Sequence, residues 1–167
     1  MKIRQIASLV GAVVFMAISA APAFAATVSR ADGQSMNPNG EPFSASGVMR
    51  VGKGSIWAAC TATFNGTMSS TGIVNITSTQ FTGAPLCSYF VSTASSASPW
   101  AGQVDSTTQL SINNAQMTVS VLGSCGPGRI AATWRDSDSS LIFNEALLPR
   151  DCVFAGMLTT SPKFHVQ

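Results

Sequence analysis

Apolar and polar residues alternate along much of the chain, in short runs separated by turn-forming residues. The clearest alternation is in the stretch QMTVSVLG, where Met117, Val119 and Val121 would lie on one face of a strand. Thr118 and Ser120 would lie on the opposite face. A repeat of two residues is the side-chain period of a β-strand with one buried face, so this stretch predicts a strand.

Further strands are predicted where β-branched residues and threonine are concentrated. These runs are residues 43–51, 55–68, 72–83 and 86–92, and the later stretches GRIAATW, SLIFNEALL and CVFAGMLTT. A polar turn at 69–71 joins the second and third runs as a hairpin. After residue 25 no stretch has convincing helical periodicity, and turn residues recur every ~8–12 positions, which is typical of an antiparallel sandwich or barrel. We expect an antiparallel β-sandwich.

Two polar segments interrupt this pattern. Residues 26–42 are rich in Gly, Pro and Asn and predict a loose N-terminal extension. Residues 92–108 are rich in serine and predict a low-complexity connection between strands. The remaining chain, residues 43–167, is expected to form a single all-β domain of ordinary size.

The N-terminus has the features of a secretory signal peptide. Lys2 and Arg4 precede the apolar run IASLVGAVVFMAIS, and the small residues of APAFA then predict cleavage just before Ala26. The alternative is a membrane anchor, but ~14 apolar residues are short for a span of ~20. We therefore expect residues 1–25 to be removed and the protein to be secreted, with the periplasm and the cell surface as other possible destinations.

Charge excludes one large class of partner. The whole chain carries a net charge of +2 at pH 7, and this excess belongs to Lys2 and Arg4 in the predicted signal peptide. The rest is close to neutral, rich in serine and threonine, and has no basic stripe of the kind that nucleic-acid binding requires. A nearly uncharged surface favours association, so self-association is an expected property.

The four cysteines are arranged as two similar units. Cys60 and Cys125 lie 65 positions apart, as do Cys87 and Cys152, and a proline shortly precedes the second cysteine of each unit. In an oxidising compartment four cysteines are typical of two disulfides. Three pairings are possible from the sequence, and a weak internal repeat favours pairing within each unit, Cys60 with Cys87 and Cys125 with Cys152.

Catalytic and metal chemistry find little support. The cysteines are too far apart in sequence for a zinc motif, and the single histidine, His165, lies next to the C-terminus, where a solvated side chain is expected. Asp136 and Asp138 superficially resemble a calcium loop but lack its other acids, so they predict a plain turn. We expect no catalytic residue, no metal and no cofactor.

Tryptophans are the candidates for an apolar contact. Trp57 and Trp134 lie in predicted strands, where core packing is expected. Trp100 lies in a predicted polar loop, and we therefore expect it to be exposed and available to an apolar partner.

Several stretches resemble the small exported bacterial proteins called protein activators of alkane oxidation, the PraB-like family. They are SASGVMRVGKGSIWAACTATFNGTM, FTGAPLC, SPW, MTVSVLGSCGPG and CVFAGMLTTSP, within residues 43–162. The resemblance implies an extracellular or envelope protein that helps bacteria to grow on n-alkanes without oxidising them itself. It carries over no catalytic residue.

Two functions are therefore expected as alternatives. The first is a non-enzymatic accessory protein that promotes the use of n-alkanes at the apolar substrate or at the cell envelope surface. The second is a structural subunit of a surface fibre or a biofilm matrix, which export, low charge and hydroxyl-rich strands would suit. Residues 26–42 lack the apolar alternation of a pilin donor strand, which argues against that form of subunit.

Overall fold

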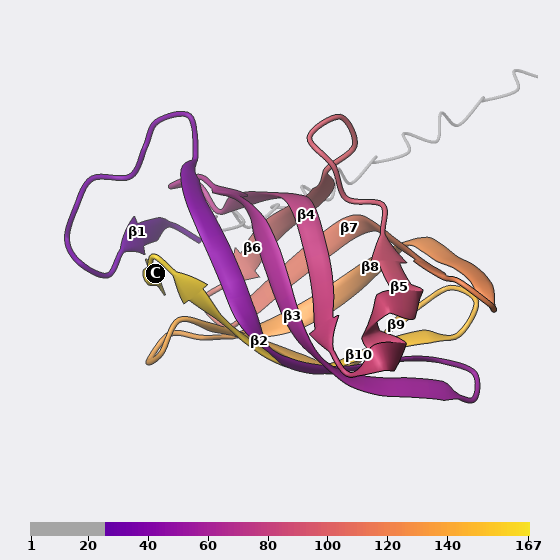
Figure 1. Ribbon diagram of the computed structural model, residues 1–167. Coiled ribbons are helices and arrows are strands. Elements are labelled where there is room, and N and C mark those ends of the chain that lie inside the picture. The colour runs from indigo at the N-terminus through magenta and orange to yellow at the C-terminus, as the bar shows by residue number, and fades with distance from the viewer. Residues whose placement is uncertain (1–25) are drawn as a thin grey trace, which may run out of the picture.

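The computed structural model describes residues 26–167, which form eleven β-strands and one short 3-10 helix (Figure 1). The strands are β1 (Val28–Arg30), β2 (Glu41–Lys53), β3 (Ile56–Met68), β4 (Ile73–Gly83), β5 (Phe90–Ser92), β6 (Trp100–Ser106), β7 (Gln109–Val119), β8 (Gly123–Arg135), β9 (Ser140–Leu148), β10 (Cys152–Ser161) and β11 (Phe164–Val166). The helix is η1 (Pro85–Tyr89). The prediction of an antiparallel all-β fold is confirmed.

Eight of these strands close into a barrel instead of a sandwich. Strands β2, β3, β4, β6, β7, β8, β9 and β10 each pair with the strands before and after them, and β10 pairs back with β2. The closing ladder is long, with Cys152 opposite Lys53 and Ser161 opposite Ser44. The prediction of a sandwich is therefore wrong. Closure satisfies the backbone groups that two stacked sheets would leave along their edges.

Alternating side chains fill the inside of the barrel. Phe64, Trp100, Phe143 and Phe154 are buried there, together with Met49. The Phe64 and Trp100 rings meet edge to face, with centroids 6.0 Å apart and an interplanar angle of 90°. An eight-stranded barrel is just wide enough for side chains to fill its interior. The interior is thus a packed core.

The segment predicted as a low-complexity connection contains a barrel strand, β6. Its buried residues Trp100, Gly102 and Val104 alternate with more exposed ones. Ile73 lies opposite Gln103 in the adjoining strand β4. The serines before β6 hide a short alternating pattern, and this is why composition alone suggested a loop. The run 86–92, predicted as a strand, is mostly η1 and becomes a strand only at β5.

Part of the N-terminal extension is tied to the barrel. Strand β1 pairs with β11, with Val28 opposite Val166, and both Ala26 and Val28 are buried. The Val28 amide also donates to the Ser70 carbonyl at 2.9 Å. The prediction of a loose extension is wrong for this part. The predicted signal peptide, residues 1–25, lies outside the described residues.

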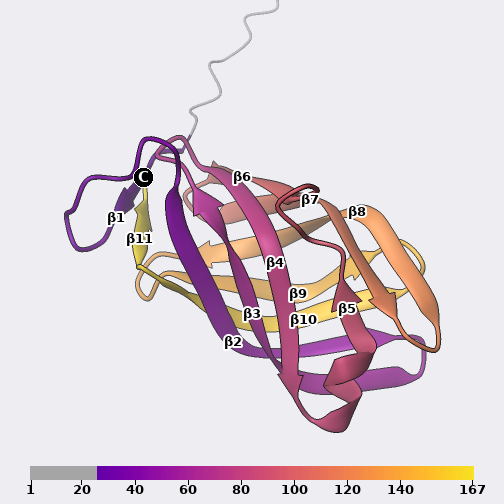
Figure 2. The same cartoon turned by 45° about the horizontal axis from the view of Figure 1, so that its top comes forward.

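The barrel has two distinct ends (Figures 1 and 2). At one end lie β1, β11 and the turns 69–72 and 136–139, and we call it the terminal end. At the other lie η1, β5 and the turns that join β2 to β3, β7 to β8 and β9 to β10. We call this second end the rim. No helix in residues 26–167 is long and apolar enough to cross a membrane.

Candidate functional site

Both disulfides lie at the rim and fix its segments to the barrel wall. Cys60 of β3 is bonded to Cys87 of η1, with the Cα atoms 5.7 Å apart. Cys125 of β8 is bonded to Cys152 at the start of β10, with the Cα atoms 5.9 Å apart. The structure therefore has the pairing expected from the repeat. The first bond holds η1 against the wall, and the second holds the turn between β9 and β10 beside β8.

The η1 segment presents apolar side chains to solvent. Pro85 begins this 3-10 helix, whose three-residue period places Leu86 and Tyr89 on the same face. Leu86 is 40% exposed and Tyr89 is 39% exposed. The Tyr89 carbonyl accepts a hydrogen bond of 3.0 Å from the Ser120 amide. This bond brings the turn between β7 and β8 beside η1.

That turn extends the apolar surface. Val121 and Leu122 occupy it and are both exposed, and Val91 of β5 is exposed as well. Val91 lies opposite Thr118 of β7, directly before the turn. The three side chains therefore lie around η1. Sequence alternation placed Val121 on the same face as the buried Met117 and Val119, but β7 ends at Val119 and the chain turns outward there.

The rest of the rim carries Trp57 of β3 and Leu147 of β9, which are also exposed. We define the apolar rim as these side chains together with those of η1 and its neighbours, namely Trp57, Leu86, Tyr89, Val91, Val121, Leu122 and Leu147. They are seven of the ten exposed large hydrophobic residues in the described chain. Clustering of this kind marks an interaction surface, whereas single exposed apolar residues are ordinary.

Cationic side chains join the segments of the rim. The Lys53 ammonium lies 2.8 Å from the Arg150 carbonyl and 3.4 Å from the Ser124 carbonyl, and it also contacts Cys125 Sγ at 3.1 Å. It thereby links the β2–β3 hairpin to β8 and to the turn after β9. The Arg50 guanidinium lies over the ring of the neighbouring Trp57, 5.3 Å from its centroid.

The tryptophan predictions are only partly correct. Trp100, predicted as an exposed apolar contact, is 1% exposed and belongs to the core, so that prediction is wrong. Trp57, predicted to be core, is 40% exposed because its neighbours Ala58 and Cys60 set the inward register of β3. Trp134 is buried as predicted. The exposed tryptophan is thus at the rim.

The acidic stretch near residue 136 forms the plain turn that was predicted, over residues 136–139. A hydrogen bond from Arg135 is the main reason that the pKa of Asp138 falls to about 2. Within residues 26–167 no group of three or more His, Cys, Asp or Glu side chains is placed to hold a metal ion.

Asp136 anchors the C-terminal strand at the terminal end of the barrel. Its carboxylate accepts hydrogen bonds from the Val166 amide at 2.8 Å and from Trp134 Nε1 at 3.2 Å, and it contacts His165 Nδ1 at 2.8 Å. Partial burial raises the pKa of Asp136, but these hydrogen bonds outweigh it and hold the pKa below the usual value. His165 is thus exposed, as predicted, yet held by a carboxylate.

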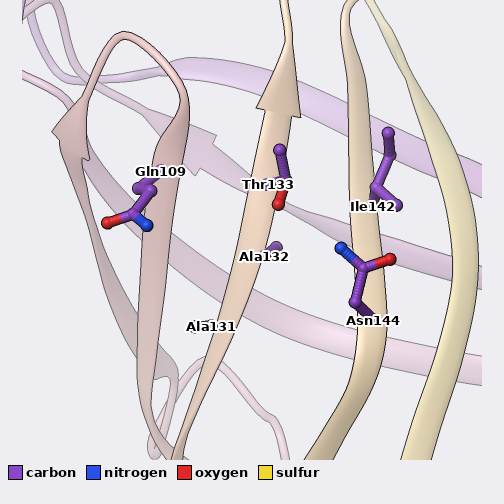
Figure 3. Close-up of a pocket in the computed structure, with 6 residues that line it drawn as sticks. All are labelled: Gln109, Ala131, Ala132, Thr133, Ile142 and Asn144. Carbon is purple, nitrogen blue, oxygen red and sulfur yellow. The ribbon is translucent and has the colours of Figure 1, made fainter.

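A shallow depression lies on the outer wall between β8 and β9 (Figure 3). These strands pair at only three positions, Thr133 to Arg135 of β8, and diverge beyond them. Ala131 and Asn144 lie on either side of the gap, and Gln109 closes it from β7. Its volume of about 160 Å³ is well below the ~300–1,000 Å³ of ordinary ligand pockets, so the apolar rim remains the stronger candidate site.

Comparison with protein families gives a match over the whole chain. The family model described as "Alkane oxidation protein activator PraA/PraB-like" matches residues 1–167, the whole chain. No curated protein and no solved structure matches.

Proposed function

Because this chain belongs to the PraA/PraB-like family of alkane oxidation activators, we propose that it promotes alkane use by adsorbing through its apolar rim. The rim would attach the protein to the boundary between water and the apolar substrate or the cell surface. No covalent step on the alkane is required of the protein. The gathering of exposed apolar side chains at one end of the barrel is the observation that carries this proposal.

The energy available from the rim is adequate for reversible adsorption. Fully burying a Val, Leu or aromatic side chain contributes roughly 1.5–3 kcal/mol. The rim side chains are about half exposed, so covering each would contribute about 1 kcal/mol, and the seven together several kcal/mol. Because the disulfides already hold η1 and the turns in place, little conformational entropy is lost when the surface is covered.

The packed core also favours surface action. The barrel interior is filled by side chains such as Phe64 and Trp100, and the outer depression of about 160 Å³ is small. A long alkane therefore has its best contact at the exposed rim. The two disulfides suit an oxidising, non-cytoplasmic location, which supports export to the place where an apolar substrate meets the cell.

The test compares two valines of nearly equal exposure. Val121 at the rim is 65% exposed, and Val48 in the wall of β2 is 66% exposed. We expect Val121→Asp to weaken the lowering of hexadecane–water interfacial tension at least several-fold, because a charge must then be desolvated. Val48→Asp should leave it close to the parent value. Thermal unfolding of both variants checks that each still folds.

Growth completes the test. A deletion strain should lag on hexadecane and grow normally on a soluble carbon source, and the parent gene should restore growth. Equal effects of the two aspartate variants would contradict the role of the rim. Equal growth of deletion and parent strains on hexadecane, with interfacial tension unchanged by the protein, would overturn the proposal and favour a structural subunit of a fibre or matrix.

A further inference from the structure

The positive charges of the molecule are distributed unevenly between paired and unpaired positions. Arginines away from the rim form ion pairs, Arg30 with Asp32 and Glu41, Arg129 with Asp105, and Arg135 with Asp138. Arg50, Lys53 and Arg150, which lie at or beside the rim, form no ion pair with a carboxylate in the described chain, and outside the rim only Lys163 near the terminal end is likewise unpaired there. Their positive charge is therefore not neutralised by a carboxylate of the described chain, although the Lys53 ammonium is hydrogen-bonded to carbonyls.

These cations lie next to the apolar side chains. Arg50 stacks on Trp57, and the Lys53 ammonium lies at the Arg150 and Ser124 carbonyls. Ser124 Oγ and Thr118 Oγ1 share a hydrogen bond of 3.1 Å, and Thr118 lies opposite Val91. A chain of contacts thus runs from the cations to the apolar residues around η1. Asp151 is the one acid within the described rim turns.

We propose that the apolar rim docks on an anionic lipid bilayer, with its aliphatic side chains among the acyl chains and its cations at the headgroup phosphates. This inference rests on the proposed adsorption through the rim and names the surface that the rim prefers. The choice follows from charge complementarity, because an apolar surface alone would suit a neutral oil droplet equally well. Unpaired cations beside an apolar surface strengthen docking only when the surface of the partner carries negative charge.

The aromatic residues of the rim support a bilayer. Trp57 and Tyr89 each have an apolar ring and a polar group, and both are about two-fifths exposed. Tryptophan and tyrosine collect at the level of lipid headgroups for this reason. Tyr89 is also the only tyrosine in the chain. Trp57 is held in place, with its Nε1 donating to the Gly54 carbonyl at 3.0 Å.

The experiment measures how much purified protein cosediments with two kinds of vesicle. The protein is used in the form that accumulates in the cells that express it. One kind is phosphatidylcholine alone, and the other is an equal mixture of phosphatidylcholine and phosphatidylglycerol. Each Lys or Arg near an anionic leaflet strengthens binding about fivefold. Counted over the same strand ends and turns, the rim has three cations, Arg50, Lys53 and Arg150, and two acids, Glu145 and Asp151. We therefore expect binding to the mixed vesicles to be about fivefold tighter. Salt at about 1 M should remove most of this difference.

A pair of charge reversals locates the contact. Arg150 at the rim and Lys163 near the terminal end are both exposed and have no side-chain hydrogen bond or ion pair among the described residues. Arg150→Glu should weaken binding to the mixed vesicles roughly twenty-fold, since one attraction is lost and one repulsion added. Lys163→Glu changes the net charge equally and should have an effect below about threefold.

The outcomes separate this inference from the function on which it rests. Equal binding to the two kinds of vesicle, or equal effects of the two charge reversals, would overturn the bilayer proposal. If the protein still lowers hexadecane–water tension in that case, adsorption through the rim stands and only the anionic bilayer is excluded. If Val121→Asp reduces neither the adsorption to hexadecane nor the binding to vesicles, the proposal that the rim is the contact surface is overturned. Competition by free inorganic phosphate at low concentration would also contradict a bilayer site.

Discussion

Replacing Trp100 should destabilise the fold without affecting a contact surface. The side chain is 1% exposed and lies edge to face with Phe64. Removing a buried tryptophan by mutation to alanine costs roughly 3–5 kcal/mol, because transfer energy is lost and a cavity remains. For a domain of this size the loss corresponds to a fall in Tm of roughly 6–20 °C. A protein of ordinary stability, ~5–15 kcal/mol, could lose most of its margin.

The polar atom of the same side chain makes a sharper comparison possible. Trp100 Nε1 is buried and has no hydrogen-bond partner among the described residues. Such a donor costs roughly 1–3 kcal/mol. Trp100→Phe removes the donor and keeps an aromatic ring near Phe64. The stability gained by removing the unpaired N–H should nearly equal the stability lost to the cavity that the smaller ring leaves. We expect a change within about 1 kcal/mol for Trp100→Phe, against a loss of ~3–5 kcal/mol for Trp100→Ala.

Equilibrium unfolding in guanidinium chloride, followed by far-UV circular dichroism, measures both variants. Trp57→Ala is the control, because its side chain is 40% exposed and its cation–π contact with Arg50 contributes only ~0.5–1 kcal/mol. If Trp100→Ala costs less than about 1 kcal/mol, or no more than the control, the burial argument fails. If Trp100→Phe costs as much as Trp100→Ala, the buried N–H is not a net cost.

Two further predictions concern the disulfides and the C-terminal strand. Replacing Cys125 and Cys152 together by alanine should cost about 3–4 kcal/mol, and removing the other disulfide should cost the same, because both join residues 27 positions apart. Urea unfolding measures both, and a difference above ~2 kcal/mol would contradict the chain-entropy account. Asp136→Asn should lower Tm at neutral pH by weakening the attachment of β11. Because the folded pKa of Asp136 is depressed, its stabilisation is complete above the unfolded value of ~3.9 and is lost as pH falls through the folded pKa. The Tm difference between variant and parent should therefore vanish in acid, and a constant difference would refute the role of the carboxylate.

Local patterns in the sequence were sufficient for most strands, and a weak internal repeat favoured the cysteine pairing that the structure has. Alternation at Met117 and Val119 gave the inward face of β7, and both residues are buried. The equal spacing of Cys60 and Cys87 and of Cys125 and Cys152 gave the pairing that the structure has. Alternation depends only on neighbours in sequence, so a single chain is enough to recognise it. The cysteine pairing instead rested on a weak internal repeat that favoured one of three possible pairings.

The candidate site could not be read in the same way. The apolar rim brings together side chains from β3, η1, β5, the β7–β8 turn and β9, which are spread along the sequence from residue 57 to residue 147. The serines around Trp100 predict an exposed residue, whereas its exposure is set by which side of β6 faces the core. The one local signal that could have helped was the pair Val121 and Leu122 in a turn.

What the sequence determined by itself was therefore the all-β class, most of the long strands and the preferred pairing of the four cysteines. Whether the strands form a sandwich or a barrel was decided by the ladder between β10 and β2, whose partners Cys152 and Lys53 are far apart in the chain. The same strand pattern suits either architecture, because alternation records only which face is buried and not which strand lies beside it. Closure then gave the molecule two ends, and only closure placed the apolar and cationic residues together at one of them.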